Sequence, residues 1–68
     1  MNRGEEHSVR AEWAAAWFRE YQCQTHYLAV LAQDTAEDCA LRCAWLAWWH
    51  ANCACRDAEA RLEELIYR

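Results

Sequence analysis

The chain has 68 residues and a mass of 8.1 kDa, which is enough for one small domain. One glycine and no proline leave too little turn chemistry for a β-sandwich or barrel, and they exclude the glycine-rich loops of nucleotide sites. A formal net charge of −4 argues against nucleic acid as a partner. We therefore expect an all-α protein.

Residues 1–7 are polar and lack the apolar core of a signal peptide. We expect a disordered tail there, followed by a single helical domain over residues 8–68. The longest uncharged run, residues 43–55, is too short to span a bilayer, and the tryptophan-rich stretch has one arginine and no lysine, unlike a basic interfacial helix. These features predict a cytoplasmic protein with reduced thiols that does not bind a membrane.

The first expected element is an amphipathic helix over residues 9–32, with Ser8 as its N-cap. Two polar residues, Glu20 and Gln24, lie within its apolar face, so the carboxylate of Glu20 must reach water or find a hydrogen-bonded partner. The apolar face itself consists of Val9, Trp13, Ala16, Trp17, Tyr21, Tyr27, Leu28 and Leu31.

A turn is expected at residues 33–35, because Asp34 and Glu37 have the capping-box spacing that begins a second helix. This helix can run to the C-terminus, but residues 52–57 are the expected place for a break, with Asp57 as a new N-cap. The predicted fold is an antiparallel helical hairpin with a third C-terminal helix or a helix extension, completing a bundle by dimerisation. In shape, although not in motif, it resembles small hairpins that dimerise into four-helix bundles.

Small side chains form a stripe along the second expected helix, at the spacing of a heptad repeat, which would let another backbone approach closely. Large apolar side chains occupy the other side, so the helix is apolar on nearly every side and needs more cover than one other helix gives. We expect one of three solutions: a compact three-helix monomer, self-association, or a different protein partner. The stripe consists of Ala40, Ala44, Ala47, Ala51, Ala54 and Ala58, and the predicted contact residues are Leu41, Trp45, Trp48 and Trp49 together with Ala40, Ala44, Ala47 and Ala51.

Three cysteines are candidates for a metal or disulfide site. Cys39 and Cys43 are one turn apart on the second helix, and a turn near residue 34 would bring Cys23 beside Cys43. A fourth zinc ligand could be His26, Glu20 or water. The same turn would bring Glu20 near Trp48 and His50, and His50 is expected to pair with Glu20. The alternatives are a disulfide between Cys23 and Cys43, or thiols that only fill the core.

Catalysis has little support, because a cysteine and a histidine alone supply neither an oxyanion site nor a loop to hold substrate. We therefore expect a small acidic helical protein that is not an enzyme and acts by contact with itself or another protein, as a homodimer, an adaptor or inhibitor, or an assembly subunit. Tryptophans would anchor the contact, and an acidic rim would suit a basic partner surface. The alternative is a thiol module that binds zinc or switches between dithiol and disulfide, and no other cofactor is expected.

Overall fold

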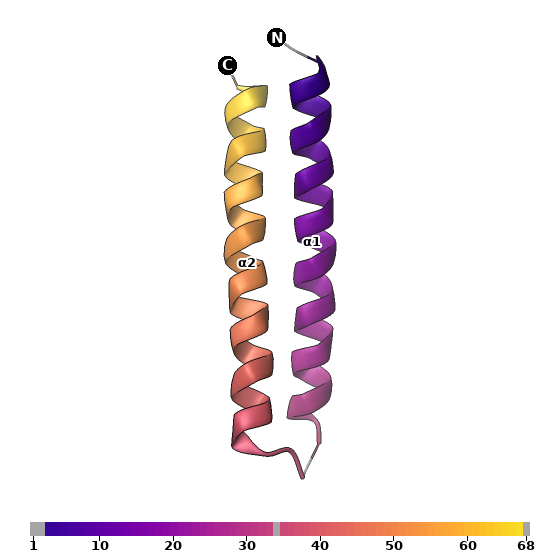
Figure 1. Cartoon of the computed structure of the whole chain (residues 1–68), viewed down its shortest axis with the longest axis vertical. Helices are drawn as coiled ribbons and strands as arrows, with labels where there is room; N and C mark the ends of the chain where they lie inside the picture. The colour runs from indigo at the N-terminus through magenta and orange to yellow at the C-terminus, as the bar shows by residue number, and fades with distance from the viewer. Residues whose placement is uncertain (1–2, 34, 68) are drawn as a thin grey trace.

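The computed structural model describes residues 3–33 and 35–67, and these form two helices that lie side by side (Figure 1). Helix α1 spans Arg3–Leu31 and helix α2 spans Asp38–Ile66. The start of α1 and the end of α2 lie at one end of the molecule, and the turn joins the helices at the other end. The Cα atoms fill a rod of 52 × 13 × 13 Å. None of the described residues is in a strand, as the all-α prediction requires.

Helix α2 continues through residues 52–57 without a break. The prediction of a third C-terminal helix is therefore wrong, and the helix extension is the form that the chain adopts. The segment contains neither glycine nor proline, and the side chain of Asn52 is bonded to Glu20 of α1 instead of competing for its own backbone. The expected dimerisation concerns a second chain and stays a prediction.

Helix α1 begins at Arg3, well before the expected start at Val9, so Ser8 lies within the helix and is not its N-cap. Two acidic residues in the first turn favour this longer helix, because they interact with the positive end of the helix dipole. One of them, Glu6, also forms an ion pair of 2.9 Å with Arg10 one turn later. Of the tail expected over residues 1–7, only residues 1 and 2 lie outside the described residues.

The connection between the helices is short and hydrogen-bonded. The amide of Gln33 donates to the carbonyl of Val30 at 3.1 Å, and the amide of Ala36 donates to the carbonyl of Gln33 at 3.3 Å. The N-cap of α2 is Glu37, in an extended conformation and without a side-chain capping bond. The second helix therefore begins at Asp38, slightly later than the expected turn at residues 33–35 would allow. Asp34 of the predicted capping box lies outside the described residues.

The helices pack through a continuous strip that we call the seam. Its members are buried or half-buried, and they recur in alternating steps of three and four residues on both helices, which is the repeat of a left-handed coiled coil. On α1 the seam consists of Val9, Trp13, Ala16, Glu20, Cys23, Tyr27 and Val30, and on α2 of Leu41, Ala44, Trp48, Ala51, Cys55, Ala58, Leu62 and Leu65. Small residues alternate with larger ones along most of the seam. The seam covers one strip of each helix, and many large apolar side chains outside it stay exposed.

Candidate functional site

A hydrogen-bonded group at the middle of the seam accounts for the carboxylate on the apolar side of α1. The Oε1 atom of Glu20 accepts bonds from the indole Nε1 of Trp48 at 3.1 Å and from Nδ2 of Asn52 at 3.2 Å. All three side chains are half-buried. These bonds compensate for part of the desolvation of the carboxylate and fix the indole of Trp48 against α1.

The expected pairing of Glu20 with His50 is wrong. His50 is exposed and lines a groove with Arg19 and Cys23, on the other side of the seam from Asn52. It follows Trp48 by two residues, which turns its side chain by about 200° around the helix axis. The sequence therefore located the level of the contact correctly through Trp48 but assigned the wrong second donor.

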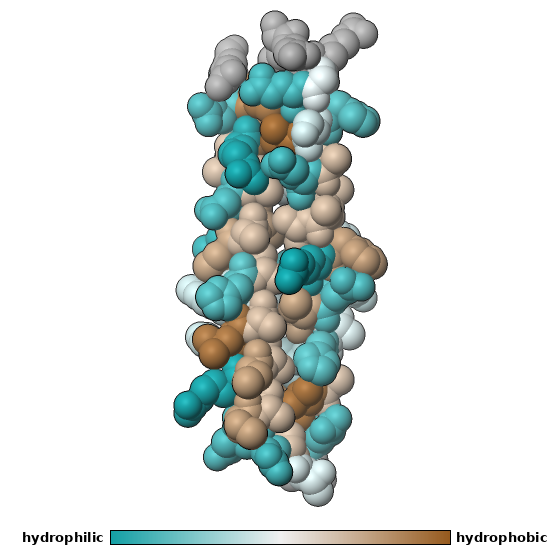
Figure 2. All heavy atoms as spheres, in the orientation of Figure 1, coloured by the Kyte–Doolittle hydropathy of each residue, from teal (hydrophilic) through white to brown (hydrophobic). Residues whose placement is uncertain are grey.

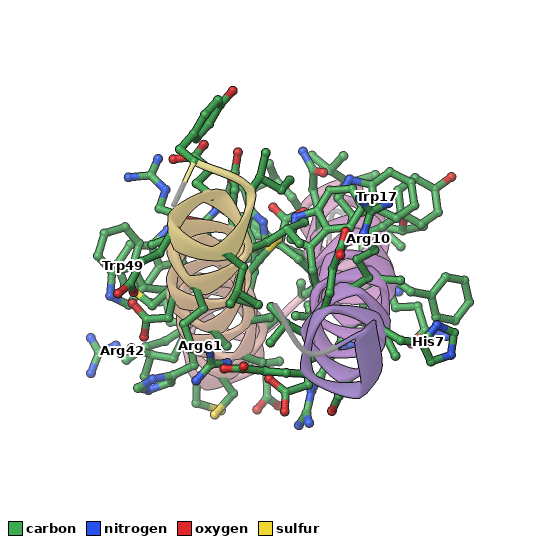
Figure 3. All side chains as sticks on the ribbon, turned by 90° about the horizontal axis from the view of Figure 1, so that it is seen from above. His7, Arg10, Trp17, Arg42, Trp49 and Arg61 are labelled. Carbon is green, nitrogen blue, oxygen red and sulfur yellow. The ribbon has the colours of Figure 1, made fainter. Side chains whose placement is uncertain are left out.

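The seam divides the rest of the surface into two faces. On each helix, the residue directly after a seam position and the residue directly before it point to opposite sides of the seam. Because the helices are antiparallel, the residues directly after seam positions lie on one side of the helix pair for both helices, and the residues directly before them lie on the other side. One contact supports this division: Arg61, which precedes Leu62, forms an ion pair of 3.2 Å with Glu12, which precedes Trp13. In the view along the helices, Trp17 and Arg61 project to opposite sides (Figure 3).

The side formed by the residues directly after seam positions is rich in aromatic rings, and we call it the aromatic face. Its ring-bearing residues are half exposed, with exposed fractions of 52% for Trp17, 55% for Tyr21, 42% for Trp45 and 52% for Trp49. Trp17 stacks on Tyr21 with ring centroids 6.1 Å apart, and Trp45 stacks on Trp49 at 5.8 Å. Figure 3 shows the ring of Trp49 projecting outward from α2, away from α1. The stacks hold four large apolar groups in fixed positions at the surface.

A groove lies within the aromatic face on α2. It has a volume of about 310 Å³ and is lined by Trp45, Trp48, Trp49, Asn52 and Arg56. Two residues of α1 hold the floor of the groove in place, because the indole of Trp48 stacks on Tyr27 at 5.5 Å and donates its hydrogen bond to Glu20. The groove therefore combines fixed aromatic walls with an amide and a guanidinium at its rim.

The opposite side, which we call the alanine face, is nearly free of rings. Figure 2 looks onto it and shows light-brown side chains along the middle of the molecule, flanked by teal ones. Small side chains leave a shallow groove of about 320 Å³ there, lined by Ala16, Arg19, Cys23, Ala47, His50, Ala51 and Ala54. The two faces differ in shape as well as in chemistry.

The predicted alanine stripe is split by the seam. Ala44, Ala51 and Ala58 are buried against α1, whereas Ala40, Ala47 and Ala54 are exposed on the alanine face. The same division separates the predicted contact residues: Trp45 and Trp49 lie on the aromatic face, while Ala44, Ala51, Leu41 and Trp48 take part in the seam. The stripe does not form one line of contact with α1, because only every second alanine lies in the seam. Between those alanines the seam contains a larger residue, Trp48 or Cys55.

The cysteines are free, and the structure does not gather the three that were predicted to share a metal or disulfide. Cys39 and Cys43 are exposed. Cys23 is half-buried and lines a groove with Ala47, which lies about one helical turn after Cys43 on α2. Within residues 3–33 and 35–67, no group of three or more histidine, cysteine, aspartate or glutamate side chains could hold a metal ion. The zinc and disulfide alternatives therefore have no assembled site among these residues.

Cys55 was not among the candidates, yet it is the cysteine that the fold buries, in the seam of α2. Burial raises the pKa of its thiol above the ordinary value of 9.0, and the negative charges of Glu20 and Glu59 raise it further. Asn52 and Arg56 were also missed as site residues. The repeat of three and four residues that begins at Leu41 would have identified Cys55 as a seam position, and the next residue, Arg56, as part of the aromatic face.

Neither helix, over the part of the chain that the structure describes, has an apolar stretch long enough to cross a membrane. Comparisons with protein-family models, with curated proteins and with solved structures find no significant match to this chain. The functional reading of the molecule therefore depends on its own geometry.

Proposed function

We propose that this protein acts by protein–protein contact through its aromatic face. The observation that carries the proposal is the set of four stacked rings, Trp17, Tyr21, Trp45 and Trp49, that stay about half exposed on one side of the helix pair. Large apolar groups gathered on one side of a small protein mark an interaction surface more often than a solvated one. The protein would act as a homodimer, as an adaptor or inhibitor, or as a subunit of an assembly.

The rings are suited to anchor a contact because little freedom remains to be lost on binding. Tryptophan and tyrosine dominate the energetics of interfaces, and each ring here is attached to a helix and stacked on a neighbour. The bonds from Trp48 and Asn52 to Glu20 hold the centre of the face in one arrangement. A partner would therefore meet a surface that already has its bound shape.

The composition of the face agrees with this role. Asn52 and Arg56 stand at the rim of the aromatic groove, where they can form hydrogen bonds with a partner once water is displaced. An interface needs such groups for specificity, whereas the interior of a folded monomer tends to avoid them. The thiol module, the alternative from the sequence, has no comparable cluster among the described residues.

A photo-crosslinking experiment in cells tests the proposal. A benzophenone amino acid would replace Tyr21 on the aromatic face, and in a matched variant it would replace Arg19, which is exposed on the alanine face. Arg19 lies about 200° around the helix from both Trp17 and Tyr21, so it points away from the aromatic face. We expect a discrete protein adduct from position 21 and little from position 19. Equal labelling from both positions, or no adduct from position 21, would contradict the proposal.

A further inference from the structure

We infer that the partner of the aromatic face is a second copy of this chain, joined by a two-fold axis parallel to the helices. In this dimer, Trp17 and Tyr21 of each copy enter the groove formed by Trp45, Trp48 and Trp49 of the other. The inference rests on the proposed function and specifies its partner. Three observations support it: the area of uncovered surface, the position of the rings relative to the groove, and the order of charges along the face.

The surface area matches what a dimer needs. The chain exposes 5486 Å², whereas a compact monomer of 8.1 kDa would expose about 4,500 Å². The difference, about 1,000 Å², exceeds the roughly 800 Å² that each partner buries in a standard interface. One side of two adjacent helices of 29 residues also offers roughly 850 Å², from a length of about 43 Å and a width of about 20 Å. A second hairpin of equal size therefore covers the face completely.

The rings and the groove lie at the same height along the rod. The bonds of Glu20 place this residue level with the stretch between Trp48 and Asn52, which is the middle of the groove. Trp17 and Tyr21 flank Glu20 on α1 and form one stack. A rotation of 180° about an axis parallel to the helices leaves every height unchanged. It therefore brings the ring stack of one copy directly opposite the groove of the other, without any sliding.

The same rotation places α1 of each copy over α2 of the other, in antiparallel orientation, so that the four helices form a bundle with antiparallel neighbours. Each contact then occurs twice, because a two-fold interface presents the same surface on both sides. The aromatic face is suited to this arrangement since it carries both the projecting rings, on α1, and the groove, on α2. An unrelated partner would need to supply both complementary shapes itself.

The charges along the face are also complementary under this rotation. At the end of the molecule away from the turn, the ion pair between Glu12 and Arg61 shows that these two residues lie at the same height along the rod. Two residues further from the turn, Arg10 of one copy therefore comes level with Glu63 of the other. Opposite charges therefore meet at this end of the face, although the chain as a whole is acidic.

Sedimentation velocity of the purified full chain, with a reductant present to keep the exposed thiols free, tests the inference. We expect a species of twice the 8.1 kDa chain mass at tens of micromolar. Replacing both Trp17 and Tyr21 by alanine should raise the dissociation constant by roughly 30-fold or more, because both rings are anchors. The control variant Arg19→Ala removes a large exposed side chain from the alanine face, about 200° around α1 from both rings, and should leave the dimer intact. A monomer at 100 μM for the wild type, or equal weakening by Arg19→Ala, would overturn the inference.

Crosslinking within the purified protein tests the geometry on a chain that keeps its seam. With the benzophenone at position 21, the adduct of twice the chain mass is isolated and digested with trypsin, which cuts after Arg42 and Arg56. We expect the label on the peptide of residues 43–56 of the second copy, which contains the groove. A label on α1 of the second copy would contradict the two-fold arrangement.

The two proposals fail in different ways. If the purified chain is a monomer while position 21 still gives adducts with other proteins in cells, the second copy is the wrong partner and the proposed function stands. If position 21 gives no adduct in cells and the purified chain is a monomer, both proposals are wrong.

Discussion

The aromatic face and the alanine face are built from positions only two residues apart, on either side of the same seam. On α2, Ala47 precedes the seam residue Trp48 and Trp49 follows it, so one face receives a methyl group and the other an indole. The seam itself gains little from this difference, since both residues are exposed. The asymmetry therefore points to a requirement outside the isolated hairpin, because folding alone does not need four stacked rings on one surface.

Exposure, and not residue type, separates the structural tryptophans of this chain from the proposed contact tryptophans. Trp48 is half-buried, stacked on Tyr27 and bonded to Glu20, whereas Trp49 is 52% exposed and touches its own helix through Trp45. Substitutions of adjacent residues can test that distinction. The tryptophan variants should be compared at a protein concentration low enough for the chain to be monomeric, since self-association adds to the apparent stability.

The largest effect is expected from Trp48→Ala. This change removes the ring that stacks on Tyr27 and takes away one of the two donors to Glu20, so the free energy of unfolding should fall by about 3 kcal/mol. The adjacent variant Trp49→Ala should lower it by less than about 1 kcal/mol. Urea unfolding followed by circular dichroism measures both. Equal losses would mean that the two rings have the same structural role.

The alanines provide the second test. Ala51→Leu should lower the free energy of unfolding by about 1 to 3 kcal/mol, because the residue is only 6% exposed and a larger side chain would force the helices apart. Ala47→Leu, on the exposed alanine face, should change it by no more than about 0.5 kcal/mol. Thermal unfolding of both variants is sufficient. A destabilising Ala47→Leu would show that the alanine face is also covered in the native protein.

The hydrogen-bonded centre should contribute a smaller amount. Glu20→Ala leaves the indole of Trp48 and the amide of Asn52 without their acceptor, at about 1 to 2 kcal/mol of stability. Glu20→Gln keeps an acceptor oxygen and should retain most of this contribution. Urea midpoints of the two variants decide the matter, and the account would be wrong if the conservative change were the more damaging one.

The buried thiol gives the smallest effect and a pH dependence of defined sign. The pKa of Cys55 is raised in the folded chain, so the unfolded thiol ionises first as the pH rises above 9.0. The contribution of this group is therefore unchanged below that pH and becomes destabilising as the pH rises toward the folded pKa. Comparing wild type with Cys55→Ala between pH 8 and 10 isolates it from tyrosine titration. Stability that falls equally in the two proteins would assign the loss to other groups.

Thiol reactivity provides an independent measure of the same burial. With a chromogenic disulfide reagent at pH 8, the exposed Cys39, Cys43 and Cys53 should react first and Cys55 last, because the reagent needs an accessible thiolate. Peptide mapping of partly modified protein gives the order. Early modification of Cys55 would show that the seam opens readily at this point.

The helical class of the fold was predictable from the sequence, because a chain with one glycine and no proline has few other options. The level at which Glu20 meets Trp48 was predictable too, since a turn near residue 34 fixes which parts of the two helices lie opposite one another. The continuity of α2 was harder to predict. Asn52 and Asp57 favour a helix break locally, but the bond from Asn52 to Glu20 is a tertiary contact that no local rule includes.

The seam itself was misread for a physical reason. The regular spacing of the alanines suggested one line of contact, yet the packing repeat alternates each alanine with a residue of another kind, such as Trp48 or Cys55. Residue size was taken as the signal where position in the repeat was the better one. Position in the repeat also separates the thiols, because Cys39 and Cys43 are exposed and lie outside the seam.

The indole signals of the five tryptophans test most directly the central claim that the aromatic face is the contact surface. Each indole N–H gives one peak in a nitrogen-correlated NMR spectrum, and single Trp→Phe variants assign the peaks. On raising the protein concentration from the monomer range, the peaks of Trp17, Trp45 and Trp49 should shift together, while that of Trp13, in the seam near the open end, should stay in place. Peaks that do not change with concentration, or a shift of Trp13 as large as that of Trp49, would contradict the account.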